Sequence, residues 1–465
     1  MMQQYQGIRR TLSPDTLLMF RLGDFYEMFF DDAHVAAGVL NLALTKRNQV
    51  PMCGIPFHAA EGYVRKLIEA GHRVAICDQT SEPQPGRIVQ REITQILSPG
   101  TVSDMQMLDA KRNNYLATLV PDGKGRFGLA VMDLSTGDFR VTELEDERAL
   151  TDELERLRPA EVVMSEEHGT GFGHIKGVVF REGYPFLLDQ AQYALLDHFR
   201  VQSLDGFGIT GKTEAIRAAG GMIHYLRVEL KRKLTNILRI RMYSRGRYMG
   251  LDSSTRANLE LVDSRGAGRD TSLLKALDRT CTPMGARRLR EWILQPLCDV
   301  GVLESRQAAI GAALANGRVL AELREVLGGV RDMERTLGRL VQAGGNARDL
   351  VVLRVGLEQV PGVQVLVDEL LGGVAESALF REIRTGLHAL PEVVELLSRA
   401  LVDEPPALVR DGGMFRDGYF AELDQLRSAG AAGKEWVADL QQRAADETGI
   451  KSLKIRYTSV FGYFI

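Results

Sequence analysis

Strand-like segments stop abruptly along this chain. Up to about residue 235, short apolar runs bounded by turn residues alternate with segments of helical periodicity, which is the pattern of α/β domains. After about residue 250 the strand signals nearly vanish, and long amphipathic stretches continue to about residue 447. A chain of 465 residues is also too long for one typical domain. The pattern therefore predicts a multidomain protein in which α/β parts come first and an all-α part follows.

A second change of pattern lies near residue 112. Residues 1–112 mix strands and helices in one α/β unit, whereas residues 113–235 open with three short strands, "NNYLATLV", "GRFGLAVMDLSTG" and "DFRVTEL". A helix and another strand follow, which indicates a separate α/β domain. We predict a helical domain over residues 236–450. Residues 451–465, "KSLKIRYTSVFGYFI", read as strand, turn and strand and begin a further domain.

Several local elements follow from turn and capping residues. "DDAHVAAGVLNLAL" reads as a helix with an acidic first turn, and "PMCGIPFH" as a loop bracketed by Pro51 and Pro56. "AAEGYVRKLIEAG" reads as a helix that ends at Gly71, and "HRVAICDQ" as a buried strand. Ser272 is a plausible N-cap for a helical stretch that contains Leu289, Trp292 and Ile293.

Charge and cysteine content exclude several classes of protein. Four scattered cysteines without a C-x-x-C pair, Cys53, Cys77, Cys281 and Cys298, read as reduced core residues. The histidines lack metal-binding spacing, the N-terminus lacks an apolar signal region, and no stretch approaches 18 uncharged apolar residues. We therefore expect a cytoplasmic protein without a metal site or membrane contact. The net charge of −3 still allows a local basic patch to bind nucleic acid.

The strongest such patch is "RVELKRKLTNILRIRMYSRGRYMG", residues 227–250, with eight Lys or Arg residues and one acid. It is either a phosphate-binding stripe or a solvated connection between domains, and charge runs more often face water.

Motifs of catalysis are missing from the sequence. There is no G-x-x-x-x-G-K-[ST], and the nearest approach, "SAGAAGKEW", places Glu435 where the Mg²⁺-binding hydroxyl belongs. G-x-S-x-G is also absent, so we predict no catalytic or cofactor-binding residue in this chain. One acid keeps an alternative open, because Asp133 ends a strand before a Ser-Thr-Gly turn, as the first metal ligand does in RNase H-like nucleases. Two-metal hydrolysis needs several convergent carboxylates, and no acidic triad accompanies Asp133.

The stretch "FRLGDFYEMFFDDA", residues 20–33, places an aromatic beside a carboxylate. In a strand, Phe25 and Glu27 share one face, and Tyr26, Met28 and Phe30 share the other. Such aromatics mostly serve the core. The alternative is a wedge that enters between base steps from the minor groove, at a cost of a few kcal/mol per unstacked step. A mispaired step opens more cheaply, so a wedge senses deformability, and a neighbouring carboxylate helps only where it can hydrogen-bond to a displaced base.

Taken together the motifs resemble the MutS family. "FRLGDFYEMFFDDA", "LALTKR", "PMCGIPFHA", "VAICDQ" and "ILSPGT" follow the order and spacing of its mismatch-recognition domain. "DLSTGDF" and "RPAEVV" resemble its connector, and "LDSSTRANLELV", "LDRTCTPMGARRLREWILQPL" and "VRDGGMFRDGY" its helical lever. The resemblance implies that Phe25 is the wedge and that Glu27 hydrogen-bonds to the mispaired base, as in the bacterial branch with a Phe-x-Glu motif. It also implies, more weakly, that Lys46 and Arg47 lie near the DNA backbone, and that the connector is RNase H-like without cutting DNA.

The same resemblance implies a function and partners. We expect a protein that recognises mismatched or unpaired bases in duplex DNA to initiate mismatch repair, as a homodimer, with a MutL-type partner on the connector, in the bacterial cytoplasm at the nucleoid. The family also has a P-loop ATPase that uses ATP and Mg²⁺ and lies beyond the point where this chain stops, Ile465. We expect the chain to be a truncated piece that ends in the first hairpin of the family's clamp domain.

Two other hypotheses are separable by experiment. An RNase H-like nuclease that uses Asp133 would cleave duplex or hybrid substrate with Mg²⁺ or Mn²⁺. A non-sensing DNA-junction or structural relative would keep its mismatch preference unchanged in a Phe25→Ala variant.

Overall fold

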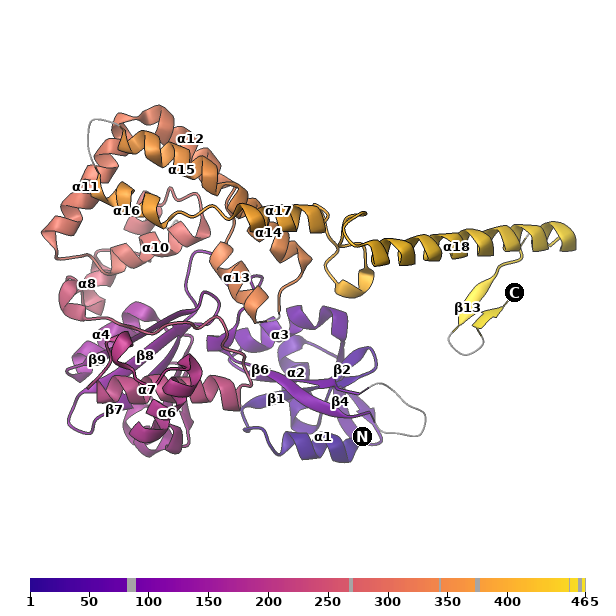
Figure 1. Ribbon diagram of the computed structural model, residues 1–465. Helices are drawn as coiled ribbons and strands as arrows, with labels where there is room; N and C mark the ends of the chain where they lie inside the picture. The colour runs from indigo at the N-terminus through magenta and orange to yellow at the C-terminus, as the bar shows by residue number, and fades with distance from the viewer. Residues whose placement is uncertain are drawn as a thin grey trace. The chain divides into compact units, whose positions relative to one another are not determined.

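The computed structural model describes residues 1–81, 89–266, 271–342, 344–372, 377–450, 452–458 and 462–464 (Figure 1). They form two compact units. The first comprises Met1–Gly345 and Val355–Ala389, and the second comprises Asn346–Arg354 and Leu390–Ile465. Two mixed sheets and a set of helices make up the first unit, so the predicted fold class, α/β parts followed by an all-α part, is confirmed.

The first sheet carries the residues singled out above. Its six strands lie in the order β3-β4-β2-β1-β5-β6. They are β1 (Thr16–Leu22), β2 (Phe25–Phe29), β3 (Thr45–Arg47), β4 (Val50–Pro56), β5 (Arg73–Gln79) and β6 (Arg91–Leu97). Helices α2 (Phe30–Leu40) and α3 (Ala60–Glu69) pack on one face, and α1 (Met2–Arg9) places Tyr5 on the other. A buried layer on each face fixes the register, since a one-residue slip would turn every side chain to the wrong side.

The second sheet has the order β11-β10-β7-β8-β9-β12. Its strands are β7 (Leu116–Pro121), β8 (Phe127–Asp133), β9 (Asp138–Leu144), β10 (Glu161–Ser165), β11 (Val178–Arg181) and β12 (Arg241–Met242). β7, β8 and β9 form an antiparallel meander, and β10 pairs parallel with both β7 and β11. This arrangement agrees with the RNase H-like connector that the resemblance implies. The predicted boundary between the second α/β domain and the helical domain is at residue 235, so β12 of this sheet lies beyond it.

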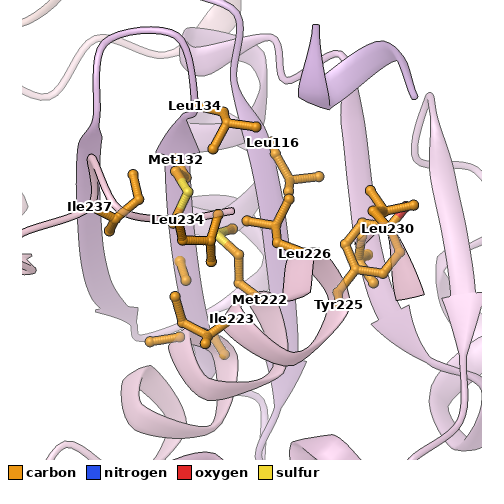
Figure 2. Close-up of a cluster of buried hydrophobic side chains, with 14 of the residues drawn as sticks. Leu116, Met132, Leu134, Met222, Ile223, Tyr225, Leu226, Leu230, Leu234 and Ile237 are labelled. Carbon is orange, nitrogen blue, oxygen red and sulfur yellow. The ribbon is translucent and has the colours of Figure 1, made fainter. Parts of the chain in front are cut away.

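Helices cover both faces of this second sheet. α6 (Leu188–Phe199) and α7 (Thr213–His224) pack on one face, and α4 (Glu147–Leu157) and the short α5 (Gly169–Phe172) lie against the other. Figure 2 shows Met222, Ile223 and Leu226 from α7 and the turn after it, packed toward Leu116 and Met132 of the sheet. The helix approaches so closely that a Cβ added at Gly128 of β8 would lie 2.0 Å from the Glu214 carbonyl oxygen. Glycine is therefore required at that position in β8.

The helical part of the first unit follows. Its helices are α8 (Ser253–Asn258), α9 (Leu273–Leu277), α10 (Pro283–Leu294), α11 (Val300–Ala315), α12 (Gly317–Gly328), α13 (Met333–Val341), the end of α14 (Ala347–Glu358), α15 (Val360–Leu371) and α16 (Ala378–Gly386). Ser272 accepts a hydrogen bond from Lys275 N and so is the predicted N-cap. The helix it caps is shorter than expected, because it ends at Leu277 before Pro283 begins α10.

One helical segment, Ala347–Leu371, is long and apolar enough by length and composition to cross a membrane. The segment carries charged residues such as Arg354, Glu358 and Asp368, so the prediction that no stretch approaches 18 uncharged apolar residues still holds. Within the first unit, Leu366 and Leu370 of this segment pack with Val319 of α12 in a buried cluster. Core helices of water-soluble proteins pass the same test, and 33 % of the most apolar window of this segment is buried.

The second unit is built from α17 (Pro391–Ala400), α18 (Ala421–Thr448) and the first part of α14. Ala347, Leu397, Ala400 and Leu401 form its buried cluster. β13 (Arg456–Thr458) and β14 (Gly462–Phe464) pair antiparallel, so the predicted strands are confirmed in their described residues, whereas residues 459–461 between them lie outside these.

Three local predictions are wrong. The segment predicted as a loop from Pro51 is strand β4, in which the two prolines occupy the second and last positions. Phe30 does not continue β2, because its φ of +56° turns the chain into α2. Cys298 is exposed rather than part of a core, although Cys53 and Cys77 are buried as expected. Apolar neighbours in sequence do not decide burial where a strand or helix ends.

Candidate nucleic-acid interface

Phe25 stands at the tip of a tight hairpin. Leu22 of β1 pairs with Phe25 of β2, so only Gly23 and Asp24 form the connection. Gly23 has φ +57°, a conformation that glycine adopts without steric cost. The Asp24 carbonyl accepts a hydrogen bond from Phe57 N at 2.9 Å, which ties the tip to the segment after β4. The sequence thus builds a short, braced projection.

Phe25 is 47 % exposed, unlike the other aromatics of these two strands. Phe20 and Phe29 are fully buried and Tyr26 is 8 % exposed. Tyr26 also donates from its hydroxyl to Asp78 Oδ1 at 2.6 Å, and burial is the main cause that raises the pKa of that phenol well above its ordinary value. These three neighbouring aromatics fill the core on the two faces of the sheet. The interpretation of Phe25 as a core residue is therefore wrong.

Glu27 lies on the same face of β2 as Phe25, as the alternation of a strand predicts. It pairs with Phe20 of β1 on one side and with Gly54 of β4 on the other. Its Oε2 lies 2.7 Å from Nη1 of Arg47. The Glu27 side chain is 13 % exposed and that of Arg47 is 46 % exposed. The carboxylate is thus covered by a guanidinium that itself faces water.

Arg47 is held by a second tight hairpin. It pairs with Val50, so Asn48 and Gln49 form the two-residue connection between β3 and β4. Both have positive φ, +49° and +67°, as a type I′ turn requires. Lys46 pairs with Pro51, and its side chain points from the opposite face of β3 because successive residues alternate. Of the predicted pair, only Arg47 is therefore directed to the face of Glu27.

Asp133, the candidate metal ligand of the nuclease alternative, has both carboxylate oxygens occupied. It is fully buried, and it accepts from Asn113 Nδ2 at 2.9 Å and from Asn114 N at 3.2 Å. Its other oxygen accepts from Ser135 N at 3.0 Å and from Ser135 Oγ at 2.6 Å. Across the described ranges, no group of three or more His, Cys, Asp or Glu residues could hold a metal ion. Asp133 is thus engaged in fixing the turn that follows β8.

Much of the basic segment 227–250 is engaged within the protein. Arg227 forms an ion pair with an acid on α6. Arg241 and Arg245 form ion pairs with acids of the domain that contains the second sheet. Arg232 donates to Gln95, Ser103 and Gln342 side chains, and its burial lowers its pKa to about 10. These contacts favour a structural role for the segment over a continuous phosphate-binding stripe.

Sequence reasoning missed the contact between Arg47 and Glu27. The two residues are twenty positions apart and lie on strands separated by β4. Since β4 was predicted as a loop, no sheet placed Arg47 near Glu27. The signal that could have found it is "KRNQVP", in which Asn48 suits a hairpin turn between two short strands.

Family models account for nearly the whole chain. Residues 1–106 match MutS domain I, residues 114–238 match MutS domain II and residues 254–456 match MutS domain III. Phe25, Glu27, Lys46 and Arg47 thus lie within the match to MutS domain I.

Curated relatives agree with these matches. "DNA mismatch repair protein MutS" of Halothermothrix orenii is 42 % identical over all of this chain, which covers 53 % of that relative. The proteins of the same name from Syntrophobacter fumaroxidans and Myxococcus xanthus are 40 % and 39 % identical, again over all of this chain and 53 % of each relative. The chain therefore spans about half the length of the curated relatives it matches.

Proposed function

This chain belongs to the MutS family, and from that premise we propose that it recognises mismatched or unpaired bases in duplex DNA to initiate mismatch repair. Phe25 inserts at the mispair from the minor groove, and Glu27 hydrogen-bonds to the displaced base. The observation that carries the proposal is the exposed phenyl ring on a braced hairpin, two residues before a carboxylate on the same face.

The geometry suits a sensor of deformability. Pushing an apolar side chain between base steps costs a few kcal/mol of unstacking, and the cost is lower at a mispair. A flexible loop would lose conformational entropy on insertion, whereas a two-residue hairpin is already ordered. Because Phe25 is already held in place, less of the favourable stacking energy is offset by the entropy cost of ordering the protein. Selectivity then comes from the step that opens most easily, not from base sequence.

Glu27 adds a condition that matched DNA does not meet. A carboxylate near a duplex is repelled by phosphates, and it stabilises the complex only when a base donates a hydrogen bond to it. A base displaced from its pair has such a donor free. The pairing of Phe25 with Glu27 thus favours mispaired sites over matched DNA, at the expense of general affinity.

In our proposal, the ATP-dependent steps of the family are not carried out by the residues of this chain. The sequence has no G-x-x-x-x-G-K-[ST], so ATP and Mg²⁺ would act in a separate module of the whole protein. We place this whole protein in the bacterial cytoplasm at the nucleoid, as a homodimer. A MutL-type partner would bind residues 113–235.

The test compares binding of the intact protein to a short duplex with and without one G·T mispair. Phe25→Ala is expected to abolish the preference for the mispaired duplex, while the dependence of affinity on salt stays largely the same because the phosphate contacts remain. Val35→Ala, which shortens an exposed apolar residue on α2, is the matched control and should keep the preference. A Phe25→Ala protein with unchanged preference would instead support a non-sensing DNA-junction or structural relative.

The nuclease alternative has a separate readout. The protein should not cleave duplex or hybrid substrate with Mg²⁺ or Mn²⁺, since Asp133 is buried and hydrogen-bonded through both oxygens. Cleavage that disappears in Asp133→Asn would overturn the proposal.

A further inference from the structure

The ion pair between Arg47 and Glu27 joins two groups that recognition needs in different places. Arg47 Nη1 and Glu27 Oε2 are 2.7 Å apart, and the contact spans β4, which lies between β3 and β2. While the pair is closed, Glu27 is neutralised and its bonded oxygen is not free for a base. Arg47 is likewise not free to pair fully with a phosphate. The closed pair is therefore incompatible with the geometry proposed for a mispair.

The environment of the pair makes it easy to exchange. Exposed ion pairs are weak, since water screens them and both long side chains lose freedom. A guanidinium binds phosphate oxygens with the same charge-assisted, often bidentate hydrogen bonds that it gives to a carboxylate. Arg47 is 46 % exposed and makes a single contact to Glu27, so a phosphate that approaches can compete for it.

We propose that Arg47 exchanges partners during recognition. It holds Glu27 in the free protein and on matched duplex, and it moves to a DNA phosphate when Phe25 enters a mispair, which releases Glu27 to the displaced base. The inference rests on the proposed function and assigns Arg47 as a positioning residue for Glu27, beyond a contact to the DNA backbone. It also explains how a carboxylate beside the wedge is tolerated on matched DNA.

The local backbone allows this exchange without refolding. Arg47 closes a two-residue hairpin, so its backbone is fixed and only its side chain needs to rotate. Between the two strands, Gly54 is the neighbour of Glu27, and a Cβ added there would lie 3.5 Å from Glu27 Cγ. The path beside Glu27 thus carries no side chain from β4 at that position.

The experiment counts phosphate contacts separately in the two complexes. The affinity of the intact protein for the G·T duplex and for its matched counterpart is measured against salt concentration, because each phosphate neutralised by a cation contributes about 0.9 to the slope of log K against log salt. For Arg47→Met we expect the slope to become shallower by about 0.9 on the G·T duplex and to stay unchanged on the matched duplex.

Two results would overturn the exchange. An equal loss of slope on both duplexes would make Arg47 a permanent phosphate contact, and no change on either would leave it on Glu27 throughout. In a Glu27→Gln protein the guanidinium is free in both complexes, so adding Arg47→Met should then lower both slopes. Asp31→Asn, an exposed acid on α2, controls for the charge that Glu27→Gln removes.

Lys46→Met is the control for a plain backbone contact. Within the described ranges Lys46 has no carboxylate partner, and its effect on the two slopes should be equal, whatever its size. Failure of the exchange is separable from failure of the proposed function. If the wild-type protein does not prefer the G·T duplex, the function is wrong. If it does, and Phe25→Ala removes that preference while the slopes change equally, only the exchange is wrong.

Discussion

Two arginine–carboxylate pairs in this protein use the same chemistry in opposite surroundings. Arg47 and Glu27 meet through one contact at the surface of the first sheet. In the helical part, Arg287 of α10 pairs with Asp332 before α13 through two contacts of 2.5 and 2.9 Å, and both side chains are under 5 % exposed. Arg287 also donates to the Ala110 carbonyl at 3.0 Å.

The difference teaches which pairs can act as switches. A buried pair has lost its hydration, so neither partner can leave without exposing an uncompensated charge to a medium of low polarity. An exposed pair can exchange one partner for another at small cost, because water or a phosphate replaces what is lost. Arg287 is therefore expected to keep its partner in the helical part, whereas Arg47 can change its partner at the surface of the first sheet.

Removing the buried guanidinium should produce the largest effect. Arg287→Met leaves the Asp332 carboxylate buried without its bidentate partner, and we expect the free energy of unfolding to fall by about 3–5 kcal/mol. Urea unfolding followed by circular dichroism measures the change. Arg288→Met, one residue along on the exposed side of α10, should change it by under about 0.5 kcal/mol. A similar small change for both variants would contradict the expectation that Arg287 keeps its partner.

The cysteines show the same difference between buried and exposed groups, here in the reactivity of their thiols. Burial raises the pKa of the Cys77 thiol to about 12 and that of Cys53 to about 11, whereas Cys298 is exposed. A rise of three pKa units lowers the thiolate fraction at pH 8 by a factor on the order of 10³. A thiol-specific reagent should therefore label Cys298 in the native protein and reach Cys53 and Cys77 only after denaturation. Rapid native labelling of Cys77 would contradict the burial.

A buried arginine that forms no ion pair with a carboxylate among the described residues should have an intermediate effect. Arg335 is 1 % exposed, and it donates to the Asp109 carbonyl at 2.8 Å, to the Arg112 carbonyl and to Ser135 Oγ at 3.2 Å. Arg335→Met removes the donor from the Arg112 carbonyl and from Ser135 Oγ, whereas the Asp109 carbonyl keeps the bond from Arg112 N at 3.2 Å, and we expect a loss of about 1–3 kcal/mol in unfolding free energy. Arg324→Met on the exposed side of α12 is the control, and equal losses would show that the carbonyls do not depend on Arg335.

Breaking the exposed pair should have the smallest effect on stability. Arg47→Met is expected to change the unfolding free energy by less than about 1 kcal/mol, because the pair is a single contact and its arginine side chain is 46 % exposed. The same urea titration measures it. A loss as large as that of Arg287→Met would mean that the pair holds the sheet together and cannot act as an exchangeable contact.

Sequence reasoning was successful where a local period carries the information. The shared face of Phe25 and Glu27 follows from the alternation of a strand. The end of α3 follows from the glycine at position 71, which adopts a φ of +88° just after the helix. The same reasoning could not place Arg47 on Glu27, because the order of strands in a sheet is not written in any one of them. The resemblance to the MutS family supplied the roles that we propose for these residues, whereas periodicity alone left Phe25 between core and wedge.

Buried polar contacts were missed for a related reason. Arg287 and Asp332 are 45 positions apart, and an arginine on an amphipathic helix reads as surface unless its partner is known. The prolines of β4 gave a misleading signal, since they stand near the strand's ends and are compatible with pairing there. Long-range pairing, not local preference, decided each of these cases.

The central claim is that Phe25 enters the duplex at a mispair, and site-specific photo-crosslinking tests it most directly. Phe25 is replaced by p-benzoylphenylalanine in the intact protein, which is bound to a duplex with one G·T mispair, irradiated and mapped for the crosslinked nucleotide. We predict crosslinks confined to the mispaired step and its immediate neighbour, with few on the matched duplex. Crosslinks spread evenly along both duplexes would contradict the claim, because they would place Phe25 near DNA without inserting it at the mispair.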